Sequence, residues 1–241
     1  VNGMTLHGGL RAFSGAFFVF SDYMKPAIRL AAIMQIPSIF VFSHDTIAVG
    51  EDGPTHQPVE QLAGLRAIFN LNVIRPADAN ETLAAWKIAM ESVKTPTAIV
   101  LTRQNVLKQS MTSYDGVIKG AYIVSPEQNK LDGILLAAGS EVGLAIETQA
   151  LLREKGKDVR VVSMPSHFLF EAQTQKYKKT ILPKSAKVLA VEMASSLSWY
   201  KYTSYVYGID KYGISAPSEV ALEMYGFVKE DVAEYFLKKL S

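Results

Sequence analysis

The sequence of 241 residues contains no cysteine, which excludes disulfide bonds, thiolate nucleophiles and cysteine-based metal sites. It also lacks an excess of one charge: 25 basic and 23 acidic side chains leave a formal net charge of +2. That balance gives no reason to expect a nucleic-acid or membrane partner. No run of 18 uncharged apolar residues indicates a membrane span, and the first residues do not resemble a signal peptide. These absences favour a cytoplasmic location.

The composition is typical of a globular protein with one or two domains. Hydrophobic side chains make up 49% of the sequence, which is enough material for a sizeable core. The chain opens on Val1 rather than on methionine, and we interpret this start as a sign of a fragment. Internal repeats and low-complexity tracts are lacking.

Strand-like and helix-like stretches alternate along the chain, which predicts an α/β fold. We expect two consecutive domains, each a mostly parallel sheet flanked by helices. The predicted strands lie near residues 16–20, 39–42, 73–75, 98–102, 133–139, 159–164 and 188–192. The predicted helices lie near residues 24–34, 57–60, 80–93, 141–155 and 229–240, with Thr55 capping the second of them. Another predicted helix is opened by Ser215-Ala216-Pro217 and stopped by Gly226. The polar stretch 108–119 reads as a linker, so we predict domains at 1–115 and 118–241.

A polar loop at residues 44–61 follows the predicted strand 39–42, and core packing does not explain its composition. His44 and His56 bracket it, but their spacing is wrong for a helical metal-binding pair. A second interpretation is sugar-phosphate recognition, with histidine donating to phosphate and Asp52 accepting from a hydroxyl. Gly50 and Gly53 would let the backbone approach a ligand. The alternative is a well-capped structural loop whose polar groups satisfy one another. A loop between two rigid elements is, however, where α/β folds usually build binding sites.

Three further features carry both a functional and a structural interpretation. Arg103 follows the predicted strand 98–102, where an arginine fork suits a phosphate and where a surface salt bridge is equally expected. The turn Gly139-Ser140-Glu141 lacks a dinucleotide or P-loop fingerprint, so we interpret it as structural. The third feature is a series of aromatic residues, for which a place in the core is favoured over stacking with a flat ligand. The series consists of Phe13, Phe17, Phe18, Phe20 and Tyr23.

The run Gly50-Glu51-Asp52-Gly53-Pro54-Thr55-His56-Gln57-Pro58-Val59-Glu60-Gln61 closely resembles the signature of transketolases, which are thiamine diphosphate enzymes. Other stretches are similar to the family in the expected order: residues 6–9, 102–105, 161–166, 199–202 and 215–217. Transketolases have a diphosphate-binding, a pyrimidine-binding and a C-terminal part. This chain resembles the last two, with the beginning of the pyrimidine-binding part missing.

The resemblance implies how the cofactor would meet the chain. Phe17, Phe20 and Tyr23 match the aromatic residues around the aminopyrimidine ring of thiamine diphosphate. The activating glutamate of the family would lie upstream of Val1. The motif for magnesium and diphosphate would lie in the first domain, so we expect no metal ligands and no bound cofactor in this fragment alone.

The resemblance also implies roles for the polar residues. His44 and Arg103 match residues that hold the sugar phosphate, and Asp52 matches the acid that reads the C2 hydroxyl. His56 matches a histidine near the reacting carbons and is the predicted catalytic residue.

The reaction implied is transfer of a two-carbon ketol unit from a ketose phosphate to an aldose phosphate, as in the pentose phosphate pathway, by a homodimer. We expect the isolated fragment to be inactive. Two alternatives stay open. One is a related thiamine enzyme, such as dihydroxyacetone synthase, deoxyxylulose-phosphate synthase or the β-subunit of a 2-oxo acid dehydrogenase. The other is a non-catalytic, folded dimerisation module.

Overall fold

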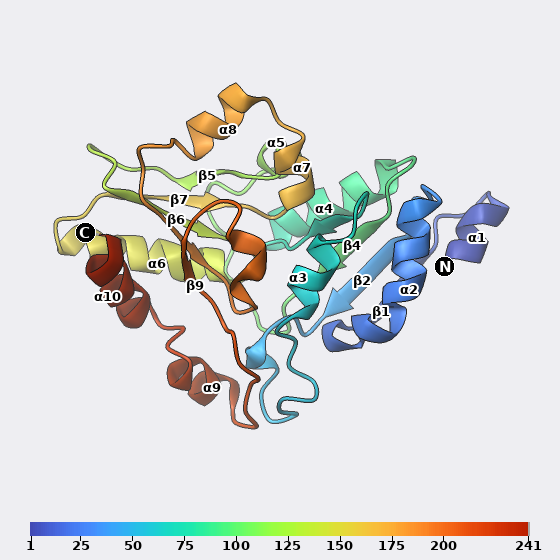
Figure 1. Ribbon diagram of the computed structural model, residues 1–241, viewed down its shortest axis with the longest axis horizontal. Coiled ribbons are helices and arrows are strands. Elements are labelled where there is room, and N and C mark those ends of the chain that lie inside the picture. Colours follow the sequence, from blue (N-terminus) through green and yellow to red (C-terminus); the bar gives the residue numbers. More distant parts are fainter. Residues whose placement is uncertain (241) are drawn as a thin grey trace.

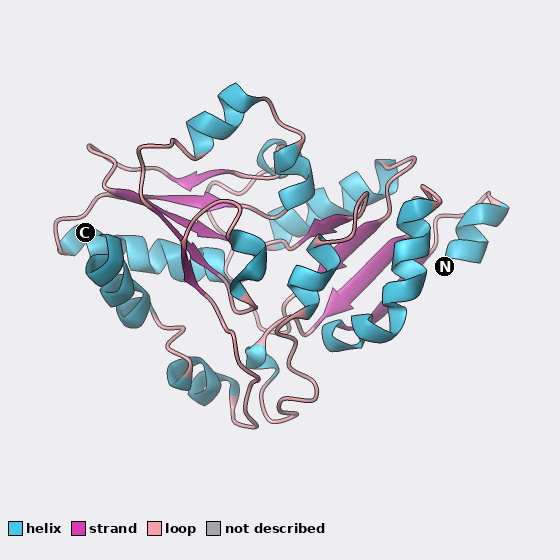
Figure 2. Ribbon diagram, in the orientation of Figure 1, coloured by secondary structure: helices cyan, strands magenta, loops and turns pink. Residues whose placement is uncertain are grey.

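A computed structural model describes residues 1–240 and contains two sheets flanked by helices (Figures 1 and 2). The first sheet is entirely parallel, with the strand order β1-β2-β4-β3. Its strands are β1 (Phe13–Phe17), β2 (Ile39–Ser43), β3 (Asn72–Ile74) and β4 (Thr97–Val100). The predicted α/β class is therefore confirmed, and parallel pairing places the carboxyl ends of all four strands at one edge.

Helices cover both faces of this first sheet. Helices α2 (Ser21–Ile33) and α3 (Gln61–Arg66) pack on one face and α4 (Ala79–Glu91) packs on the other, while α1 (Asn2–His7) buries none of its residues. Side chains of β2 alternate between the faces: Phe40 and Phe42 join a core that contains residues of α2 and α3. Ile39 points the other way, into the core that contains residues of α4. Figure 1 shows α2 and α3 on the near side of the sheet.

The second sheet has the order β5-β7-β6-β8-β9, and only its edge strand β5 runs antiparallel. Its strands are β5 (Tyr122–Ser125), β6 (Gly133–Ala137), β7 (Val159–Ser163), β8 (Val188–Val191) and β9 (Tyr205–Tyr207). An antiparallel edge on an otherwise parallel sheet is common in such folds. The prediction of mostly parallel sheets holds for both.

Six helices accompany the second sheet: α5 (Tyr114–Val117), α6 (Glu141–Glu154), α7 (His167–Glu171), α8 (Gln175–Ile181), α9 (Ser218–Met224) and α10 (Lys229–Leu240). Leu135 of β6 packs on the face that also holds residues of α6 and α10. Its neighbour Leu136 packs on the opposite face, with residues of α7 and α8. Three short 3-10 turns complete the fold: η1 (Phe18–Phe20), η2 (Ile47–Val49) and η3 (Ser196–Trp199).

The two sheets share one hydrophobic core. Ile99 and Ala84, from the first sheet and α4, belong to the same buried cluster as Leu135 and Val142, from the second sheet and α6. The expected linker 108–119 is not an extended connection: it contains α5, and the Thr112 hydroxyl donates to Asp78 Oδ2 at 2.6 Å. The proposed boundary between residues 115 and 118 stays a prediction.

Several local predictions were wrong. The helix expected at residues 57–60 does not form, and α3 begins only at Gln61. Gln57 is buried and donates from its side-chain amide to backbone carbonyls, which holds this stretch in turns. The strand expected at 16–20 begins earlier, at Phe13, and gives way to the turn η1. Strands β5 and β9 and helices α1, α5, α7 and α8 were not predicted. Among residues 1–240, no helix has the length and apolar character needed to cross a bilayer.

Candidate functional site

The strand ends of the first sheet bring distant polar residues together. In the parallel register, Phe17 of β1 lies beside Ser43 of β2, and Phe42 lies beside Val100 of β4. His44 therefore follows β2 directly, next to Phe17, while Arg103 follows the neighbouring strand β4. The carboxyl edge of a parallel sheet is where ligands bind in α/β folds, so the predicted position of the site is consistent with the geometry.

His44 has an unusual backbone conformation and a close aromatic neighbour. Its φ of 62° is in the left-handed region, which is uncommon outside glycine. The ring stacks on Phe17 with 3.7 Å between centroids and 16° between planes, and Nδ1 lies 2.8 Å from Ser43 Oγ. The strained conformation thus places the imidazole flat against the aromatic residue at the end of β1.

Burial, followed by the positive charge of Arg103, lowers the pKa of His44, while the carboxylates of Asp52 and Asp45 act in the opposite direction. The imidazole is therefore predominantly neutral at pH 7. A neutral ring has one donor nitrogen and one acceptor nitrogen, whereas Arg103 carries a permanent charge. Together the two residues offer a phosphate one hydrogen-bond donor and one cation.

The aromatic series divides between core and surface. Phe18 is fully buried and packs against Phe42, as the core interpretation predicts. Phe20 lies 6.4 Å from the ring of Phe17 in a stacked arrangement and 6.1 Å from the ring of Tyr23, which is 85% exposed. These three rings form an accessible aromatic surface, which is suited to a flat ligand.

His56 joins this aromatic surface to the polar loop. Its ring meets the edge of Phe20 with 5.4 Å between centroids, and its Nδ1 lies 2.9 Å from Thr55 Oγ1. Asp52 and Arg103 are exposed, and among residues 1–240 no hydrogen bond from another side chain holds either of them. Five of the seven predicted site residues are thus in ring-to-ring contact. The remaining two act on His44 through their charges.

Gly50 and Gly53 both lie beside residues 215–218. Both have positive φ, at 94° and 73°. A Cβ on Gly50 would lie 3.4 Å from Ser218 Oγ, and one on Gly53 would lie 3.1 Å from Ser215 Cβ. The glycine at position 53 therefore permits a close approach of Ser215, whereas a Cβ on Gly50 would make only an ordinary van der Waals contact. Approach of this backbone to a ligand stays a prediction.

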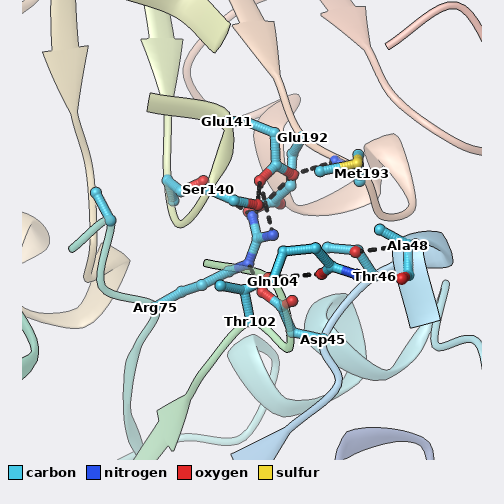
Figure 3. Close-up of polar contacts among 12 residues, drawn as sticks. Asp45, Thr46, Ala48, Arg75, Thr102, Gln104, Ser140, Glu141, Glu192 and Met193 are labelled. Carbon is cyan, nitrogen blue, oxygen red and sulfur yellow. Dashed lines mark hydrogen bonds and ion pairs between the residues drawn. The ribbon is translucent and has the colours of Figure 1, made fainter. Parts of the chain in front are cut away.

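A buried ion cluster beneath the site was not predicted (Figure 3). Arg75, after β3, contacts three carboxylates at 2.8 to 3.2 Å: Asp45 of the polar loop, Glu141 at the start of α6 and Glu192 after β8. Arg66 binds Glu192 from the other side at 2.6 Å. All three acids are isolated in sequence, so no local pattern could have revealed that they converge.

The charges of this cluster are set by burial and pairing. Burial raises the pKa of Glu141 against the opposing charge of Arg75. Burial also acts to raise the pKa of Glu192, but Arg66 and Arg75 together hold that pKa below its usual range. Glu141 additionally accepts a hydrogen bond from the backbone N–H of Met193 at 2.5 Å. The turn before α6 therefore has a structural role, as predicted.

The candidate site is distinct from the other surface features of the described residues. Within the described residues, no three His, Cys, Asp or Glu side chains lie close enough together to hold a metal ion. A cleft of about 910 Å³ lies between α3 and α7 and is lined by Phe69 and Phe168 among others. It is separate from the carboxyl edge of the first sheet.

Comparison with known proteins gives two successive domain matches. The transketolase pyrimidine-binding domain matches residues 1–108, and the transketolase-like C-terminal domain matches residues 120–228. The chain is 59% identical over 235 residues to the transketolase of Bacillus subtilis, which covers 94% of this chain and 35% of that protein. It is 55% identical over 239 residues to the transketolase of Staphylococcus epidermidis, which covers 96% of this chain and 36% of that protein.

A solved structure gives the same result. Transketolase from Leishmania mexicana superposes with a TM-score of 0.95 at 44% identity, covering 98% of this chain and 35% of that one. The chain thus spans about a third of the length of the curated relatives that it matches. Two successive domain matches and this level of identity show that the chain belongs to the transketolase family.

Proposed function

We propose that this chain forms the pyrimidine- and substrate-contacting part of a transketolase, at domains 1–115 and 118–241. The complete protein would transfer a two-carbon ketol unit from a ketose phosphate to an aldose phosphate in the cytoplasm. The observation that carries the proposal is the stacking of His44 on Phe17 at the sheet edge, beside the end of the neighbouring strand that leads to Arg103. Family membership supplies the reaction class.

In the proposed substrate complex, Arg103 and His44 hold the phosphate group. The arginine supplies charge and a fork of donors, and the imidazole supplies one N–H without requiring protonation. Asp52 would accept a hydrogen bond from the sugar C2 hydroxyl. His56, between the polar loop and the aromatic surface, would contact the hydroxyls near the reacting carbons and exchange a proton there.

Thiamine diphosphate fits the aromatic surface of Phe17, Phe20 and Tyr23, because the rings are accessible and lie beside the two histidines. When bound, the cofactor supplies the nucleophilic carbon and the electron sink for carbon–carbon cleavage. The residues of this chain would orient the pyrimidine ring and the sugar. Magnesium and the diphosphate would be held by the family's first domain, which this chain does not resemble.

We also propose that the 241-residue chain is inactive on its own. Purified chain would be incubated with xylulose 5-phosphate, ribose 5-phosphate, thiamine diphosphate and magnesium, and product formation would be followed. The expected result is no ketol transfer, with transketolase of Bacillus subtilis as the active control. Turnover by the chain alone would sink the proposal. A donor and acceptor screen on the complete protein would separate transketolase from dihydroxyacetone synthase.

The second candidate is a non-catalytic dimerisation module, which the apolar surface near α2 favours. Leu30, Ile33 and Met34, at the C-terminal end of α2, are each more than half exposed. Such a patch is typical of an interface. In the proposed homodimer, this patch would form part of the interface between the two copies. Light scattering on the purified chain decides: a strict monomer at high concentration argues against self-association through this surface.

A further inference from the structure

The polar loop is held in shape by a segment more than 150 residues further along the chain. This segment, residues 213–218, ends at the first residue of α9 and lies beside the polar loop at the lower edge of Figure 1. Ser215 Oγ donates to the carbonyl of Glu51 at 2.5 Å, and Ser218 Oγ donates to the carbonyl of Ala48 at 2.7 Å. Both acceptors are backbone groups of the polar loop, one of them directly before Asp52.

The buried side chain of Gln57 ties the same two segments together from within. Its Nε2 lies 2.8 Å from the carbonyl of Ile47, 3.0 Å from that of Gly50 and 2.9 Å from that of Ile214. A Cβ on Gly213 would lie only 1.8 Å from Gln57 Oε1. The 213–218 segment therefore fits against the polar loop without space for an additional side chain.

The carbonyl of Ala48 also connects the polar loop to the segment that carries Arg103. It accepts a second hydrogen bond from the side-chain amide of Gln104 (Figure 3). Gln104 Oε1 in turn accepts from the hydroxyl of Thr102 at 3.1 Å. The Ser218 hydroxyl thus completes a junction between the segment that bears Arg103 and the loop that bears His44, Asp52 and His56.

We propose that Ser215 and Ser218 are positioning residues, and that the 213–218 segment sets the spacing between the two ends of the sugar-phosphate site. His44 and Arg103 form the phosphate end; Asp52 and His56 form the hydroxyl end. The identity of the ligand rests on the proposed function. The serine hydroxyls bond to backbone carbonyls of the loop, so their effect on the ligand is indirect. Sites whose supporting contacts are removed lose affinity through small displacements.

The chain offers four spectroscopic probes for this proposal, because it contains only four histidines. His44 and His56 report on the two ends of the site, while His7 and His167 lie in α1 and α7. In imidazole NMR spectra of the 241-residue chain, the double variant Ser215→Ala/Ser218→Ala should shift or broaden the signals of His44 and His56. The signals of His7 and His167 should persist and show that the fold is retained.

A matched control and a rescue separate positioning from general loosening. Ser125→Ala removes a hydroxyl that donates to Gln149 Oε1 at 2.6 Å, in β5, and should leave the site histidines unchanged. Ser218→Thr keeps the hydroxyl and should give the same imidazole spectrum as the chain without substitutions. Unaltered His44 and His56 signals in the double variant overturn the proposal, as does an equal response to Ser125→Ala. If the double variant does not fold, Ser218→Ala alone decides by the same comparison.

Ligand titration then tests the spacing. In the double variant, the dissociation constant for ribose 5-phosphate should rise by about tenfold, while that for inorganic phosphate should stay within about twofold. An equal loss for both ligands overturns the claim that spacing is what the segment controls. Failure of ribose 5-phosphate to perturb His44 or His56 in the unchanged chain would contradict the proposed function. The comparison of ligand-free spectra would still decide the role of the 213–218 segment.

Discussion

At the residue scale, the charge state of His44 is the property most open to measurement. The ring is held against Phe17 at the end of a parallel strand, and Arg103 lies on the neighbouring strand end. Binding a phosphate does not need a second cation here, because arginine stays charged at every working pH. A neutral imidazole adds a directional hydrogen bond without competing with Arg103 by charge repulsion.

Two substitutions should move the His44 pKa in opposite directions. Arg103→Ala removes a positive charge that disfavours the imidazolium, so the pKa should rise above that of the unchanged chain. Asp52→Asn removes a negative charge that favours the imidazolium, so the pKa should fall further. NMR pH titration of the His44 ring measures both, and Arg103→Lys, which keeps the charge, is the control. Shifts of the same sign in both variants would contradict this account.

At the element scale, Gly120 decides whether β5 can join the second sheet. Its φ of 80° turns the chain between α5 and β5. A Cβ at this position would lie 2.1 Å from the backbone nitrogen of Phe170 and 2.5 Å from the carbonyl oxygen of Ser166. Both neighbours are backbone atoms, one in α7 and one in its N-cap residue, so they cannot move aside as a flexible side chain would.

Gly120→Ala should therefore destabilise the chain by more than about 2 kcal/mol. Gly156 is the matched control. It has a similar φ of 76°, but a Cβ there would meet nothing within 4 Å. Gly156→Ala should carry only the left-handed strain of about 1 kcal/mol. Urea denaturation of the two variants measures the difference, and equal losses would show that crowding against α7 is unimportant.

At the scale of the whole molecule, the ion cluster around Arg75 joins the two sheets. One guanidinium holds Asp45 from the first part of the chain and Glu141 and Glu192 from the second. All four side chains are almost completely buried. Removing one partner of a buried ion pair leaves uncompensated charge in the interior, which is far more costly than losing an exposed pair.

Arg75→Met should destabilise the chain by about 3–5 kcal/mol. The matched substitution Arg160→Met breaks the more accessible pair with Glu127 and should cost about 1 kcal/mol. The chain has two tryptophans, Trp86 on α4 and Trp199 on η3, so fluorescence of single-tryptophan variants follows each sheet separately. With both arginines in place, the unfolding transitions that the two tryptophans report should coincide. Equal losses for the two arginine variants would contradict the proposed coupling.

The sequence predicted some features of the fold and of the candidate site but not others. Motifs pointed to Phe17, Phe20, Tyr23, His44 and His56, which lie together at one sheet edge. Their assigned roles remain predictions. Local patterns also gave most buried strands, because a run of apolar residues needs no knowledge of its partners. The helix at 57–60 failed because Gln57 turns inward to satisfy distant carbonyls, which propensity does not register.

The amino-acid sequence by itself determined the α/β class, the family and the segment that carries the site, since these follow from periodicity and from a contiguous motif. Only the tertiary structure decided which residues are buried and which residues contact one another. It placed Phe18 in the core and Phe20 on the surface, gathered three acids around Arg75, and set residues 213–218 against the polar loop. The physical reason is that these contacts join groups separated by up to about 170 residues, and chain folding, not local pattern, brings them within hydrogen-bond distance.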